Sequence, residues 1–245
     1  MKYLSPLAAA LFALVVWQGI VTFTGWPKFI LPGPAIVAET WWDNRWIIAK
    51  DTWVTAIEVL TGFVFGVTLG VVTAVSLASS RMTRILVRPL LVFTQALPVF
   101  ALAPLLTLWL GFDLWSKVAM AMLIIYFPVT SSFFDGLMRT PAGYLDLART
   151  MQASPRAVLW HIRIPAALPS LASGMRLAAV YAPIGAVIGE WVGGSSGGLG
   201  NLMLLANGRA KTDLMFAAML TLGVFSILLH MVVHRATARM AGEVR

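Results

Sequence analysis

Six apolar segments, each close to the length of a membrane-spanning helix, alternate with more polar stretches along the chain. A helix needs roughly 20 residues to cross the hydrocarbon core of a bilayer. The pattern therefore predicts an all-α integral membrane protein with six transmembrane helices. The predicted spans cover residues 7–24, 54–78, 90–110, 118–137, 171–192 and 214–233.

The first apolar segment follows Lys2 and so begins like a secretory signal peptide. A signal peptide ends in a polar region with small residues, where it is cleaved. Here the apolar run continues through "VVWQGIVTFTG" without such a region. We therefore expect residues 7–24 to be a retained span and residues 1–245 to form a single transmembrane domain.

Composition narrows the function further. Hydrophobic residues make up 59% of the 245 residues and charged residues only 11%, whereas roughly a quarter of an ordinary soluble domain is charged. Six spans and their loops leave no room for a separate soluble catalytic domain. The chain contains no cysteine, which excludes disulfides and thiolate nucleophiles.

The basic residues fall unevenly between the two sides of the predicted bundle. Twelve of the 18 lysines and arginines lie at the termini, around residues 81–88 and within residues 139–176. The other side holds Lys28, Arg45, Lys50, Lys117, Arg209 and Lys211. Because cytoplasmic loops carry the excess of positive charge, both termini are expected in the cytoplasm. We interpret the net charge of +8 in this way and expect no nucleic-acid partner.

Small and aromatic residues indicate how the helices pack. Gly62, Gly66 and Gly70 recur every four residues and share one helix face, which predicts close contact with another helix. The outer segment "GWPKFILPGPAIVAETWWDNRWIIAKDTW" holds five tryptophans and predicts an element lying at the membrane interface. Prolines predict kinks in the third and fourth spans, at Pro98, Pro104 and Pro128.

One polar stretch, "YLDLARTMQASPRAVLWHIRIPAALP", separates the fourth and fifth spans. Leu145, Ala148 and Met151 have the spacing of one helix face, and Ser154 followed by Pro155 is typical of a new helix start. Two short helices joined by a turn would form a knob in the cytoplasm, suited to docking another protein. The alternative, a plain connector, does not need apolar residues on a helix surface. We call residues 139–169 the coupling segment.

The coupling segment resembles a motif of the permease subunits of bacterial ABC importers. That motif reads E-A-A, three residues, G, nine residues, I-x-L-P, and every spacing matches here. The matched positions are Asp146, Leu147, Ala148, Gln152, Ile162, Ile164 and Pro165. Asp146 keeps the acid, Leu147 is larger than alanine and Ile164 stays apolar. Gln152 stands where the family has glycine, so a turn with positive φ is expected to be strained.

The resemblance implies a type I ABC importer permease fold that works as a homodimer. It also implies two cytoplasmic ATPase subunits, an extracytoplasmic substrate-binding protein and a location in the bacterial inner membrane. ATP and Mg²⁺ would be held by the ATPase, since no G-x-x-x-x-G-K-[ST] loop occurs in this chain. We expect Leu147, Ala148 and Met151 to form the apolar centre of the ATPase contact, with Asp146 and Arg149 at its rim.

The sequences "ALPVFALAPLLTLWLGFDLWSKVAMAMLIIYFPVTSSFFDGL" and "GMRLAAVYAPIGAVIGEWVGGSSGGLGNLM" are similar to the nitrate, sulfonate and taurine branch of these permeases. "GEWVGGSSGGLGNLMLLANGRAKTDLMFAAML" is most similar to permeases for pyrimidine precursors of thiamine. A small neutral heterocycle is therefore expected as substrate, with sulfonate, taurine or nitrate as alternatives. Candidate pathway residues are Gln95, Phe100, Tyr126, Tyr181 and Glu190.

Other readings of the chain have less support. Glu190 lies in the fifth span before "GGSSGGLG", where it either faces water at the helix end or accepts hydrogen bonds from that loop. His230 and His234 share a helix face but have no third ligand nearby in sequence, so no metal site and no enzyme activity is predicted. An ATP-independent channel or secondary transporter is the remaining alternative, although no internal repeat supports it.

Overall fold

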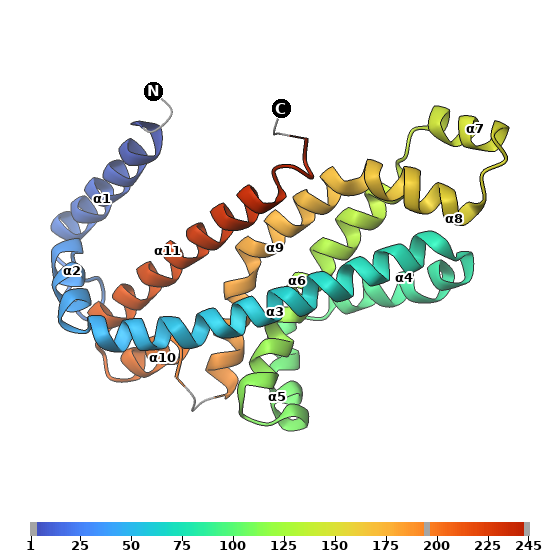
Figure 1. The fold of residues 1–245 in the computed structure, drawn as a ribbon. Coiled ribbons are helices and arrows are strands. Elements are labelled where there is room, and N and C mark those ends of the chain that lie inside the picture. The colour runs from blue at the N-terminus through green and yellow to red at the C-terminus, as the bar shows by residue number, and fades with distance from the viewer. Residues whose placement is uncertain (1–3, 194–196, 243–245) are drawn as a thin grey trace.

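The computed structural model describes residues 4–193 and 197–242, which form helices joined by turns and contain no strand (Figure 1). The first half contains α1 (Leu4–Thr24), α2 (Pro34–Asp43), α3 (Arg45–Ser79), α4 (Arg81–Ala96), α5 (Val99–Leu110) and α6 (Leu114–Met138). The second half contains α7 (Ala142–Thr150), α8 (Pro155–Val158), a π-helical turn (Leu159–Arg163), α9 (Ile164–Gly193), α10 (Leu199–Gly208) and α11 (Thr212–Thr237).

Five of the six predicted spans correspond to single helices. Among the described residues, four helices are long and apolar enough to cross a membrane: residues 45–79, 114–138, 155–193 and 212–237. Two shorter apolar helices, Ala8–Thr24 and Val99–Leu110, lie in the first and third predicted spans. α3 and α9 begin earlier than predicted because each helix continues into polar or aromatic sequence that hydropathy alone leaves out.

The third predicted span, residues 90–110, is not one helix. α4 ends at Ala96 and α5 begins at Val99, with Leu97 and Pro98 both in extended conformations. A residue before proline is disfavoured in the α region, and Pro98 has no N–H to continue the helical ladder. The predicted kink in this segment is therefore a complete break, which divides the apolar run between two helices.

The two sides of the molecule match the distribution of basic residues. In Figure 1 the beginning of α1, the end of α11 and the α7–α8 pair lie toward the same side. α2, α5 and α10 lie toward the opposite side. The first side is the one that the arginine-rich segments assign to the cytoplasm.

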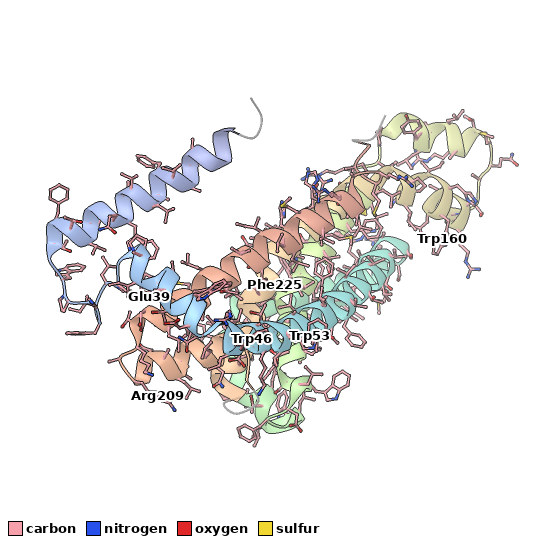
Figure 2. The ribbon with its side chains drawn as sticks, turned by 60° about the vertical axis from the view of Figure 1, so that its left-hand side comes forward. Glu39, Trp46, Trp53, Trp160, Arg209 and Phe225 are labelled. Atoms are coloured by element: carbon pink, nitrogen blue, oxygen red, sulfur yellow. The ribbon has the colours of Figure 1, made fainter. Side chains whose placement is uncertain are left out.

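The tryptophan-rich outer segment folds into α2 and the first turns of α3. Trp42, Trp46 and Trp53 are all more than half exposed. The Arg45 guanidinium lies 4.9 Å from the ring centre of Trp42 and 5.7 Å from that of Trp46. Figure 2 shows Trp46 and Trp53 on α3, far from Trp160 in the coupling segment. Exposed indoles at this end of the bundle fit the belt that lines a membrane interface.

α6 lies between α3 and α9, and glycines allow both neighbours to approach it closely. A Cβ atom added at Gly62 would lie 2.6 Å from the Cβ of Ala121, and one at Gly66 would lie 2.8 Å from Cγ2 of Ile125. From the other side, a Cβ at Gly185 of α9 would lie 2.6 Å from the Cα of Ala121. The main hydrophobic core is built on these contacts.

We predict that Gly66→Leu destabilises the α3–α6 contact, because no space exists for a side chain. Overpacking of this kind costs about 2 kcal/mol, measurable as a lower melting temperature of the purified protein. Gly19→Leu is the matched control, since nothing lies within 4 Å of a Cβ at that position. Equal melting temperatures of the two variants would contradict this packing.

Candidate functional site

The coupling segment projects beyond the bundle as α7 and as the beginning of a long helix that starts at α8 and continues into α9 (Figure 1). Ser154 begins the second helix: its Oγ accepts a hydrogen bond from the Ala157 N–H at 3.3 Å, and Pro155 occupies the first helical turn. Ser at the N-cap and Pro at the next position satisfy the free end of a helix. The helix start predicted at Ser154–Pro155 is therefore present.

Gln152 forms the turn between the two helices with φ of 54°. The Ala153 N–H donates to the Ala148 carbonyl and the Gln152 N–H to the Arg149 carbonyl, at 2.9 and 3.0 Å. These two bonds make a Schellman motif, which normally places glycine at the left-handed position. The turn keeps the geometry that the family's glycine would have, although a side chain is present, so strain is expected at this residue.

The exposed surface of α7 is centred on Leu147 and Met151, which are 59% and 74% exposed. Ala148 is only 3% exposed, so the prediction that its side chain lies at the centre of a partner contact is wrong. Leu147 and Met151 are four residues apart and share one helix face, whereas Ala148 is turned about 100° away. Asp146 and Arg149 form an exposed ion pair at 2.9 Å beside this apolar patch.

Within the coupling segment a π-helical turn connects α8 to α9, with the Ile164 N–H donating to the Leu159 carbonyl. A π-helical turn is a single wider turn inside an α-helix. This one lies just before Pro165, which has no N–H to donate. Ile162 is partly buried, Ile164 packs against the main core and Pro165 is exposed. The helix consequently runs without interruption from residue 155 to residue 193.

A groove of about 610 Å³ lies between the coupling segment and the cytoplasmic end of α3. Its α3 side is formed by Val75, Ala78 and Ser79. The coupling segment contributes Trp160 and three arginines, namely Arg149, Arg156 and Arg163. The groove therefore combines an apolar wall with positive charge.

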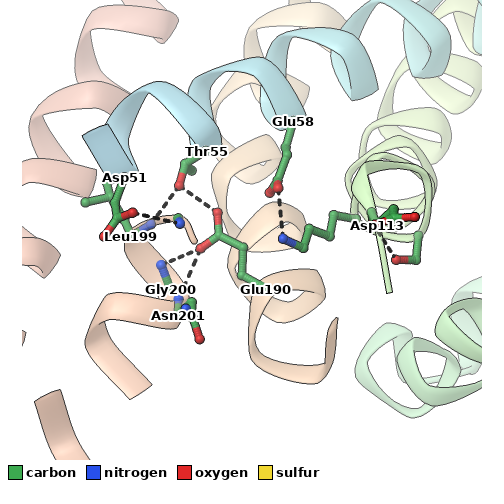
Figure 3. A network of polar contacts seen from close by, with 11 residues as sticks. Asp51, Thr55, Glu58, Asp113, Glu190, Leu199, Gly200 and Asn201 are labelled. Atoms are coloured by element: carbon green, nitrogen blue, oxygen red, sulfur yellow. Dashed lines mark hydrogen bonds and ion pairs between the residues drawn. The ribbon is translucent and has the colours of Figure 1, made fainter. Parts of the chain in front are cut away.

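A second set of polar residues is buried at the other end of α9, around Glu190 (Figure 3). The Glu190 side chain is fully buried. Its Oε1 accepts a hydrogen bond from Thr55 Oγ1 at 2.6 Å, and its Oε2 accepts from the N–H groups of Gly200 and Asn201. Of the two roles predicted for Glu190, the one facing water is therefore wrong, and the hydrogen-bonding role agrees with these contacts.

These contacts satisfy the whole amino end of α10. The first four N–H groups of a helix have no intrahelical partner. Here the N–H groups of residues 198–201 donate in turn to Asp51, Thr55 and, for the last two, Glu190. Glycine is needed at 198 and 200, because a Cβ at either position would collide with the Glu190 carboxyl group. Residues 194–196 of the glycine-rich stretch "GGSSGGLG" lie outside the described residues.

An ion pair beside Glu190 was not predicted from the sequence. Glu58 Oε1 on α3 lies 3.2 Å from Lys117 Nζ on α6, and both side chains are 1% exposed. Lys117, which lies one residue before the predicted fourth span, is in the first turn of α6 and is buried there. Glu58 is four residues before Gly62 on the same helix face, and that spacing could have predicted a position against α6. We call Thr55, Glu58, Lys117 and Glu190 the polar cluster.

The four candidate pathway residues whose side chains the structure describes do not form one site within this protomer. Tyr126 donates a hydrogen bond to Thr73 Oγ1 on α3 at 3.2 Å and is partly buried between helices. Phe100 and Tyr181 are exposed on α5 and α9. The Gln95 side chain lies outside the described residues. Glu190 instead joins α9 to α3 and α10.

Comparisons with known proteins place these features in a family. The model of the family described as "Binding-protein-dependent transport system inner membrane component" matches residues 66–245. A probable ABC transporter permease of Haemophilus influenzae is 46% identical over 94% of this chain and 93% of its own length.

Several relatives are named for a substrate, and two of these are more than 30% identical to this chain. The formylaminopyrimidine transport permease ThiX of Halalkalibacterium halodurans is 34% identical, over 79% of this chain and 78% of its own. The riboflavin transport permease RibX of Chloroflexus aurantiacus is 35% identical, over 89% and 81%. Among solved structures, an inward-facing form of the MetNI methionine ABC transporter matches with a TM-score of 0.69 and 19% identity, over 81% of this chain and 98% of that one.

We predict that Glu190→Gln destabilises the junction between α9 and α10. An amide has one acceptor oxygen in place of two and directs its NH₂ group toward backbone donors. A buried donor without a partner costs about 2 kcal/mol, so the melting temperature should fall and transport should decline. Glu39→Gln removes the same charge at an exposed position of α2 and serves as the control. Unchanged stability and transport in Glu190→Gln would show that the buried contacts contribute little.

Proposed function

The chain belongs to the family of binding-protein-dependent transport system inner membrane components, and on that premise we propose that it imports a small aromatic heterocycle, such as a pyrimidine precursor of thiamine. It is the permease subunit of an ABC importer, a multi-pass membrane protein that transports and does not hydrolyse ATP. We further propose a homodimer in the bacterial inner membrane, assembled with two ATPase subunits and an extracytoplasmic binding protein.

The observation that carries the ATPase contact is the exposed apolar patch of Leu147 and Met151 on a helix that projects from the bundle. Apolar side chains at the centre of a patch, with the Asp146–Arg149 pair at its edge, have the composition of a protein interface. The neighbouring groove adds three arginines that would suit acidic side chains of a partner.

α9 links this surface to the polar cluster. Ile164 at its start and Glu190 near its end belong to one helix, and 26 residues at 1.5 Å each separate them by roughly 40 Å. When ATP brings the two ATPases together, the coupling segments would move with them and tilt α9. That movement would act on the junction of α3, α9 and α10, exchanging inward-facing and outward-facing states.

The substrate proposal has two supports. The 34% identity to ThiX suggests a pyrimidine, and the 35% identity to RibX also indicates a flat heterocycle. In addition, Lys117 is the one lysine or arginine buried among the described residues, and its ammonium group is paired with Glu58. An importer of sulfonate, taurine or nitrate would benefit from basic groups in its pathway. A sulfonate permease of Bacillus subtilis is a more distant relative, at 28% identity.

We predict that Leu147→Glu weakens binding of the ATPase subunit. The substitution removes an apolar contact and forces a carboxylate to lose water at the centre of the interface, which costs about 2 kcal/mol, or near 30-fold in affinity. Co-purification of the ATPase and uptake should both decrease. Arg239→Glu, also exposed on the cytoplasmic side, is the control. Undiminished co-purification with Leu147→Glu would place the docking site elsewhere. Ala148 is unsuitable as a probe because its side chain is buried within the protomer.

We predict that the binding protein which works with this permease takes a pyrimidine. Specificity in such importers resides mainly in that subunit, so calorimetry on it tests the substrate directly. A formylated or hydroxymethylated aminopyrimidine should bind, whereas taurine, alkanesulfonates and nitrate should not. Binding of a sulfonate or nitrate, with none of pyrimidines, would contradict the substrate proposal and leave the permease assignment intact. Binding of riboflavin alone would indicate that the importer takes a flavin, the substrate for which RibX is named, and not a pyrimidine.

A further inference from the structure

One oxygen of the buried Glu58 carboxyl group has no hydrogen-bond donor. Oε1 is paired with Lys117, but Oε2 is buried and accepts no hydrogen bond from the described residues. The carboxyl groups of Glu58 and Glu190 lie within hydrogen-bonding reach of each other. Two ionised carboxylates only accept hydrogen bonds, so such a contact requires a proton on one of them.

The charges of the polar cluster lead to the same requirement. Two carboxylates and one ammonium group leave one negative charge without a partner in the interior of a membrane protein, where unpaired charge is strongly unfavourable. Asp51 on α3 and Asp113 before α6 are the other ionisable groups labelled around the cluster in Figure 3, and Lys50 precedes Asp51 in the chain. Asp51 is only partly buried and bonds to Gly198. α10 contributes backbone amides at this point and no basic side chain.

The hydrogen bonds show which carboxyl group has room for the proton. Both oxygens of Glu190 already accept from donors, namely Thr55 on one side and two backbone N–H groups on the other. A proton on Glu190 would face one of those donors. Glu58 Oε2 has no donor pointing at it.

We propose that the polar cluster is a proton-binding site, in which Glu58 Oε2 holds one buried proton and donates it to the Glu190 carboxylate. Glu58 then accepts from Lys117 through Oε1 and donates through Oε2, so both of its oxygens have partners. The cluster as a whole becomes neutral: Lys117 is positive, Glu190 is negative and Glu58 is uncharged.

The proton has a structural consequence. It leaves Glu190 ionised, and an ionised carboxylate is the stronger acceptor for Thr55 and the amide groups of α10. Without the proton, two facing carboxylates on α3 and α9 would repel each other at the point where these helices meet. The proton on Glu58 is therefore needed for α3, α9 and α10 to pack together at this point. These contacts lie within one protomer, so the inference does not depend on the transported substrate.

Glu58→Gln and Glu58→Leu test the site in the importer purified with its ATPase. Gln has the same shape as a protonated Glu, with an oxygen for Lys117 and an NH₂ group for Glu190. We expect Glu58→Gln to melt within about 2 °C of the wild type, while Glu58→Leu, which breaks both contacts, melts on the order of 10 °C lower. If Glu58 is ionised instead, Gln removes the charge paired with Lys117, and the two variants will be destabilised to a similar extent. That outcome overturns the proposal.

Infrared spectroscopy supplies a readout that does not depend on stability. At neutral pH the wild type should show the C=O stretching band of a protonated carboxylic acid, slow to exchange in D₂O because the group is buried. The band should be absent from Glu58→Gln and retained in Glu39→Gln, whose substituted side chain is exposed. A wild type without the band, or a band that persists in Glu58→Gln, would contradict a proton on Glu58.

Discussion

The hydrogen bonds of the Glu190 carboxylate hold together three helices, α3, α9 and α10, at the outer half of the bundle. Backbone amides at the start of a helix need acceptors, and the apolar interior of a membrane protein offers no water to supply them. Glu190 on α9, with Thr55 and Asp51 on α3, provides those acceptors for α10. Glu58 and Lys117 add α6 to the same group. Gly198 and Gly200 follow from this requirement, because a Cβ at either position would collide with the Glu190 carboxyl group. Gly185 and Gly189 of α9 instead make room for α6.

The coupling segment is placed differently, since it projects beyond the bundle. Its apolar residues divide into two groups: Ala148 is buried within the protomer, while Leu147 and Met151 face outward. The Schellman turn at Gln152 fixes that division by setting the angle between α7 and α8. One continuous helix then connects this surface to the polar cluster. A movement of the coupling segment when the ATPase docks would therefore be transmitted along this helix to the contacts of the polar cluster.

Much of this arrangement follows from the sequence. The apolar segments predict five of the spans, and the spacing around Ser154 predicts the two helices of the coupling segment. The break at Pro98 is harder to predict, since proline inside a span can produce either a kink or an end. Lys117 falls just outside the predicted fourth span because hydropathy treats each charge alone, whereas a charged side chain can be buried when a distant residue such as Glu58 contacts it. The inward orientation of Ala148 likewise depends on tertiary packing that periodicity does not specify.

The central claim is that this chain moves its substrate only when an ATPase drives it, as the permease subunit of an importer. Uptake into proteoliposomes tests it most directly, with the permease reconstituted alone or together with its ATPase and binding protein. We expect uptake only when both partners and ATP are present, and none when a non-hydrolysable ATP analogue replaces ATP. Uptake of equal rate by the chain alone, without ATP, would contradict the account and indicate a channel or secondary transporter.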